Sequence, residues 1–77
     1  METKDPKAAR DEFAEAFWAQ VSKLKEERRM SLSVLADLSG LSRSSLNYAL
    51  WDKGRTYPTV KSLLGLSIAF QLPPIAL

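Results

Sequence analysis

Arg43, Ser44, Asn47 and Tyr48 carry hydrogen-bonding side chains at intervals of one and four residues. Residues four apart share one face of an α-helix, so Arg43 and Asn47 would project together, with Ser44 and Tyr48 beside them. A guanidinium group can donate to both O6 and N7 of guanine, and a carboxamide can pair with N6 and N7 of adenine. The four side chains therefore suit a helix that contacts base edges in the major groove of DNA.

Three side chains in or next to this set, Tyr48, Ser45 and Trp51, could have roles other than hydrogen bonding to a base. The Tyr48 ring can contact either a thymine methyl group or a phosphate. Ser45 lies near the start of the expected helix and can face either the groove or the protein. Trp51 lies one turn further along, and we interpret it as a partly buried wall of the site rather than as a base reader.

Serine and basic residues around this segment could bind phosphate groups. The first amides of a helix have no intrahelical acceptor, so a helix start with serines can bind an anion. The same serine can cap the helix through its hydroxyl and still present its backbone to a phosphate. The predicted phosphate contacts are Ser31, Ser33, Ser42, Lys53, Arg55 and Lys61.

The segment that carries these residues has the pattern of two short helices joined by a tight turn. Ala36 offers a methyl-sized side chain where the helices would cross, and Gly40 accepts positive φ at no steric cost. Leu46, six residues after the glycine, would face inward from the second helix. The other apolar positions of the pattern are Leu35, Leu41, Ala49 and Leu50. This spacing predicts a helix-turn-helix with the polar side chains on its outer face.

Capping residues and helix breakers divide the chain into four expected helices. These cover about residues 6–29, a segment from Ser31 or Ser33 to about Ser39, about 43–52 and about 60–71. The expected N-terminal caps are Asp5, either Ser31 or Ser33, Ser42 and Thr59. The expected terminators of the last three helices are Gly40, Gly54 and the pair Pro73 and Pro74.

The first helix has an apolar stripe with helical spacing. Phe13, Phe17, Val21 and Leu24 recur at intervals of four, four and three residues, which indicates one buried face. Trp18 lies off this stripe. It either belongs to the edge of the core or meets a partner.

The last helix is apolar on more than one side. One face would hold Val60, Leu63, Leu64, Ser67 and Ile68, with Leu66 and Phe70 partly round from it. A short chain cannot easily cover all of this surface, and a monomer rarely leaves several hundred Å² of it bare. We therefore predict a homodimer, although the tail could instead fold back over its own core. The predicted interface residues are Leu66, Phe70, Leu72, Ile75 and Leu77.

Length and composition limit the possible functions. The 77 residues fit a single domain, 1–77, with a frayed start at 1–5 and a tail at 73–77. The chain has no cysteine and no histidine, which excludes disulfides, thiol nucleophiles and thiolate or imidazole metal sites. The remaining carboxylates have the spacing of surface pairs, and the chain is too small for a deep pocket. We expect no enzymatic activity, no metal, no cofactor and no small-molecule ligand.

Charge and hydropathy indicate where the protein acts. The net charge of +2 comes from eleven basic and nine acidic residues, and residues 1–29 are balanced. Residues 30–77 hold the excess positive charge, with Arg43, Lys53, Arg55 and Lys61 against Asp37 and Asp52. No segment approaches the ~18 apolar residues of a membrane span, and the start lacks the apolar stretch of a secretory signal. A cytoplasmic location is therefore expected.

The run LADLSGLSRSSLNYAL, followed by DKGRTYPTVKSLLGLSIAF, resembles the DNA-binding domain of Cro and lambda-repressor-type regulators. In that family a motif close to LAxxSGVSRSTIxxI precedes a polar loop, a proline and an apolar helix. The segments SLSVL and SSLNYAL are also similar to the Ner-type repressors of transposable phages. The chain has Leu32 where the family often has a phosphate-contacting glutamine, so that contact is not expected here.

The resemblance implies a fold and a function. The fold is all-α, a compact four- to five-helix lambda-repressor-like domain. The function is transcriptional regulation by a homodimer that binds a short inverted repeat in double-stranded DNA. A protein-interaction module, such as an antitoxin or adaptor that uses its apolar C-terminal helix, is the alternative.

Overall fold

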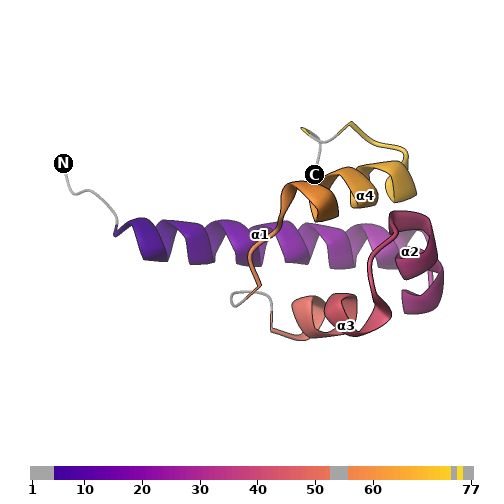
Figure 1. Ribbon diagram of the computed structural model, residues 1–77, viewed down its shortest axis with the longest axis horizontal. Coiled ribbons are helices and arrows are strands. Elements are labelled where there is room, and N and C mark those ends of the chain that lie inside the picture. Colours follow the sequence, from indigo (N-terminus) through magenta and orange to yellow (C-terminus); the bar gives the residue numbers. More distant parts are fainter. Residues whose placement is uncertain (1–4, 53–55, 74, 76–77) are drawn as a thin grey trace.

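Four helices make up the part of the chain that the computed structural model describes, residues 5–52, 56–73 and 75. They are α1 (Pro6–Glu27), α2 (Leu32–Ser39), α3 (Arg43–Trp51) and α4 (Val60–Phe70), and no strand occurs among these residues. The prediction of an all-helical fold with four helices is confirmed. In Figure 1, α4 lies above the long α1 and α3 below it, while α2 closes one end of the molecule.

Each helix begins at a polar residue whose side chain accepts a hydrogen bond from a backbone N–H in the first turn. These caps are Asp5, Ser31, Ser42 and Thr59. The sequence analysis gave either Ser31 or Ser33 as the N-terminal cap of α2. The structure shows Ser31 in this role, because its hydroxyl oxygen accepts from Val34 N–H over 3.1 Å. In α4 the cap is reciprocal, since Ser62 Oγ also accepts from the backbone N–H of Thr59.

Left-handed residues follow three of the helices: Arg29, with φ of 53°, comes just after α1, and Gly40 and Gln71 come directly after α2 and α4. Gly40 follows α2 with φ of 73° and donates its N–H to the Ala36 carbonyl oxygen, as expected for a glycine C-cap. At the end of α4, Gln71 adopts φ of 56°, and Leu72 N–H bonds to the Ser67 carbonyl oxygen. The last helix therefore stops before Pro73. The predicted terminators Gly54 and Pro74 lie outside the described residues.

The core forms where all four helices meet. Its fully or nearly buried apolar residues are Ala14, Phe17, Trp18, Val21, Leu35, Ala36, Leu46, Ala49, Leu66, Ala69 and Phe70. Trp18 thus belongs to the core. Its ring meets Phe17 edge-on at 4.9 Å between centroids, and its Nε1–H donates to the Thr56 carbonyl oxygen over 2.7 Å.

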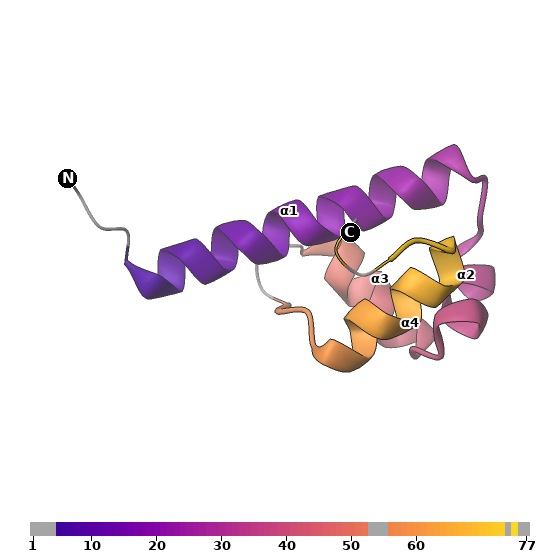
Figure 2. The same ribbon diagram turned by 90° about the horizontal axis from the view of Figure 1, so that it is seen from above.

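The stripe predicted on the first helix is only partly buried. Phe17 and Val21 lie in the core and Leu24 packs against it, but the Phe13 side chain is 64% exposed. Figures 1 and 2 show why, because the N-terminal half of α1 extends beyond the other three helices. The prediction of a buried Phe13 is therefore wrong.

The faces predicted for the last helix are also corrected. Leu66 and Phe70 are fully buried, together with Ser62, Ser67 and Ala69. The outer face carries Val60, Leu64 and Ile68, at positions i, i+4 and i+8. Because α4 is apolar on most sides, its periodicity does not reveal which side meets α2 and the core.

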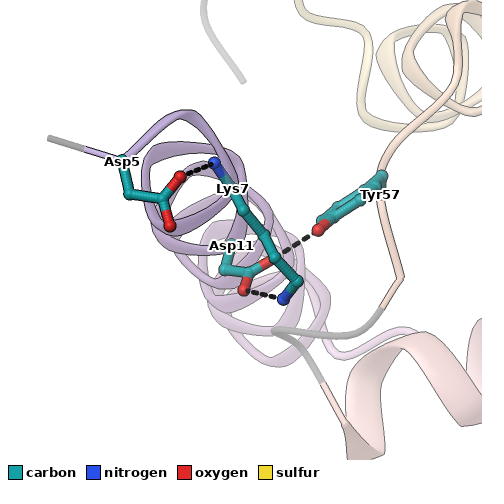
Figure 3. A network of polar contacts seen from close by, with 4 residues as sticks. All are labelled: Asp5, Lys7, Asp11 and Tyr57. Atoms are coloured by element: carbon teal, nitrogen blue, oxygen red, sulfur yellow. Dashed lines mark hydrogen bonds and ion pairs between the residues drawn. The ribbon is translucent and has the colours of Figure 1, made fainter.

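Long-range polar contacts join α1 to the second half of the chain. Figure 3 shows the Tyr57 hydroxyl donating to the Asp11 carboxylate, which also receives a hydrogen bond from Lys7 Nζ over 3.1 Å. At the other end of α1, the Arg28 guanidinium donates to the Phe70 carbonyl oxygen and lies 5.8 Å from the centre of the Phe70 ring.

Across the described ranges, even the 22-residue α1 lacks the apolar stretch that a bilayer-crossing helix would need.

Candidate nucleic-acid interface

The candidate site is built on α2, α3 and the three residues that connect them. Leu35 and Ala36 are buried on α2, and Leu46 and Ala49 are buried on α3, so the two helices pack through these faces. Gly40 turns the chain between them. This burial fixes which side of α3 points away from the protein.

The outer side of α3 carries the four predicted base contacts. Arg43, Ser44, Asn47 and Tyr48 are all exposed. Arg43, Ser44 and Asn47 also line one open hollow of about 380 Å³, together with Leu32 at the first turn of α2. The structure thus brings three of the four predicted residues to one concave surface beside the start of α2.

Two of the predicted phosphate-binding serines act as helix caps. The Ser31 hydroxyl oxygen accepts from Val34 N–H, and the Ser42 hydroxyl oxygen accepts from Ser45 N–H, each over 3.1 Å. Ser42 also donates its own hydroxyl proton to Ser45 Oγ over 2.7 Å. Their hydroxyls are therefore used within the protein, and a phosphate at these helix starts would meet mainly the first backbone amides.

Of the other predicted phosphate contacts, the structure describes Ser33 and Lys61. Ser33 is exposed on the first turn of α2, and Lys61 is exposed on α4 rather than on the helix pair. Lys53 and Arg55 lie outside the described residues. Within the described part of α2 and α3, Arg43 is the one cation.

Trp51 differs from its sequence-based interpretation. Its side chain is 79% exposed, and its ring centre lies 6.4 Å from that of Tyr48. The inward side of α3 is set by Leu46 and Ala49, whereas Trp51 follows Asn47 by one turn on the outward side. The prediction that Trp51 forms a partly buried wall is therefore wrong. It rested on the size and apolarity of the indole, whereas the position of Trp51 on α3 points the side chain outward.

The predicted dimer interface is also changed by the structure. Leu66 and Phe70 have 0% exposed surface within one chain, so they are not available to a partner. Leu72 is half-buried, Ile75 is almost fully exposed, and Leu77 lies outside the described residues. The exposed apolar residues of α4 are instead Val60, Leu64 and Ile68.

Among the described residues, no group of three His, Cys, Asp or Glu side chains is arranged to hold a metal ion. Comparison of the chain with protein-family models, curated proteins and solved structures finds no match.

Proposed function

We propose that this protein is a sequence-specific DNA-binding transcriptional regulator, a repressor in the cytoplasm, built on a Cro or lambda-repressor-type helix-turn-helix. In this proposal α3 lies in the major groove. The observation that carries it is the exposure of Arg43 and Asn47 on one face of α3, while Leu46 and Ala49 behind them are buried. A bidentate contact from each side chain would discriminate between bases by about 1–3 kcal/mol.

The starts of α2 and α3 would hold this helix on the DNA backbone. Leu32, the first residue of α2, lines the same hollow as Arg43, the first residue of α3. Two helix N-termini beside one hollow offer several backbone amides and two positive dipole ends to phosphate oxygens. Phosphate contacts of this kind fix orientation, and the side chains of α3 then select the sequence.

We further propose that the protein binds as a homodimer to a short inverted repeat. Two recognition helices in such a dimer lie about 34 Å apart, one turn of DNA. The exposed row Val60, Leu64 and Ile68 on α4 supports association, since it leaves apolar surface uncovered, as does Ile75 in the tail. These residues replace the buried Leu66 and Phe70 in the proposed interface.

Selection of bound duplexes from a random pool, with sedimentation of the same sample, tests both proposals. We expect an inverted repeat and a complex of two chains with one duplex. If each chain neutralises about four phosphates, the logarithm of the binding constant should fall with the logarithm of the salt concentration with a slope of about −7. Binding that ignores salt, or equal competition by an unrelated duplex, would contradict sequence-specific DNA binding.

A protein-interaction module is the second candidate function. The same row on α4 favours it, because an uncharged helix face of this kind can receive an amphipathic partner. In that case α4 variants would abolish partner binding, and α3 variants would have no effect.

A further inference from the structure

Trp51 is a large, exposed apolar side chain at the C-terminal end of α3, on the same side as the polar residues Arg43 and Asn47. It follows Arg43 by eight residues and Asn47 by four, so the three side chains lie within about 80° of each other around the α3 axis. The Trp51 side chain is 79% exposed, although burial of an indole is normally favourable. Its ring lies beside the neighbouring Tyr48 ring, at 6.4 Å between centroids. Stability of the fold therefore does not explain why tryptophan stands here.

The position of Trp51 on α3 suggests what it contacts. Four residues of helix advance about 6 Å, close to the rise of two base pairs in DNA. In a helix-turn-helix the first part of the recognition helix lies deepest in the major groove. A residue at the last position, Trp51, needs a long side chain to touch the same groove, and tryptophan is the largest available.

The chemical groups in the major groove then indicate which base Trp51 contacts. The thymine C5-methyl group is the apolar feature of the major-groove edge, whereas guanine, cytosine and adenine present hydrogen-bonding groups there. We propose that Trp51, supported by Tyr48, packs against a thymine methyl group about two base pairs from the base that Asn47 contacts. The site would thus select thymine by an apolar contact beside its polar readout. This inference rests on the proposed DNA-binding function.

Parallel selections with the wild-type protein and Trp51→Ala test the specificity. We expect both proteins to enrich the positions that Arg43 and Asn47 read, and only the wild type to enrich thymine about two base pairs further along. Phe13→Ala is the matched control, because Phe13 is an exposed aromatic residue on the projecting half of α1. Its selected motif should equal that of the wild type.

A second experiment removes only the thymine methyl group from the DNA. Deoxyuridine in place of that thymidine should weaken wild-type binding by about five- to tenfold, and Trp51→Ala should weaken it to a similar degree. The two changes together should cost little more than one of them, because they remove the same contact. The salt dependence should be unchanged in Trp51→Ala, since the indole carries no charge.

Fluorescence gives a direct readout, because the chain has two tryptophans and Trp18 is buried with its N–H bonded to Thr56. The selected duplex should change the emission of the wild type, and the change should be absent in Trp51→Phe. An identical motif for wild type and Trp51→Ala, with no effect of deoxyuridine, would overturn this inference while the DNA-binding proposal stands. If neither protein enriches any motif, the DNA-binding proposal itself fails, and the inference with it.

Discussion

Gly65 of α4 lies directly against the backbone of Ser39, the last residue of α2. A Cβ atom at position 65 would be 2.1 Å from the Ser39 carbonyl oxygen and 3.1 Å from its carbonyl carbon. No real side chain fits at that distance, so glycine is required for this approach of the two helices. Since α2 leads into α3 through Gly40, the contact also helps set the position of the proposed recognition surface on α3.

Gly65→Ala should therefore destabilise the fold by about 2 kcal/mol or more, because the added methyl group would push α4 away from the α2 backbone. Urea unfolding followed by circular dichroism measures the change. Gly40→Ala is the matched control, since a Cβ there meets no atom within 4 Å and only the left-handed φ of 73° opposes it. That conformational cost is about 1–2 kcal/mol. A Gly65→Ala protein as stable as the wild type would contradict the close approach.

The double variant Arg43→Ala with Asn47→Ala should lose specific DNA binding and keep its fold. Both side chains are exposed, so their truncation leaves the core intact. Each lost bidentate contact should cost about 1–3 kcal/mol of base discrimination. Fluorescence anisotropy with the selected duplex measures binding, and thermal unfolding checks the fold. The interaction-module function would be favoured by two results together: wild-type DNA affinity in this double variant, and loss of binding to a protein partner in variants of the α4 row.

Tyr57→Phe should raise the pKa of the Asp11 carboxyl group. The Tyr57 hydroxyl bond and then the Lys7 ammonium hold this pKa below its ordinary value, because both stabilise the ionised form. Since the folded-state pKa is lowered, the associated stability is present above the unfolded-state pKa and is lost as pH falls through the folded-state pKa. NMR titration of the Asp11 side chain measures the shift. Tyr48→Phe removes a hydroxyl from α3 and should leave Asp11 unchanged.

Ile68→Lys should prevent self-association without unfolding the chain. Ile68 is 71% exposed on the outer face of α4, so a charge there meets water in the monomer and apolar surface in the proposed dimer. Sedimentation should show one chain where the wild type shows two. Phe13→Lys is the control, since Phe13 has similar exposure on the far half of α1. A dimer that survives Ile68→Lys and dissociates in Phe13→Lys would place the interface on α1 instead.

Features that depend on neighbours in sequence were the ones that could be predicted. The caps Asp5, Ser42 and Thr59 act on amides two or three residues away, and Gly40 acts on its own φ. The approximate first and last residues of the helices could be predicted from these caps and from Gly40. The outward face of α3 could also be predicted from the sequence, because the helical spacing of Leu46 and Ala49 is enough to identify the inward side.

Features that depend on distant parts of the chain were missed. Phe13 fits the apolar stripe of α1, but it belongs to the N-terminal half of that helix, which extends beyond the other three helices. On α4, Val60, Leu64 and Ile68 alternate with equally apolar Leu66 and Phe70, so the pattern alone cannot select the inner side. Gly65 gave no local signal, since its role depends on the carbonyl group of Ser39, 26 positions earlier by sequence numbering.

The Arg28 contact has a consequence for how the chain unfolds. Its guanidinium holds the carbonyl group of Phe70, which lies 42 positions away, and so closes the segment between the end of α1 and the end of α4 into a ring. The proposed helix-turn-helix, made by α2 and α3, lies within that ring. Loss of the Arg28–Phe70 contact at either end would free both helix ends and lengthen the unconstrained loop, so α2 and α3 should unfold together with α1 and α4 as one cooperative unit.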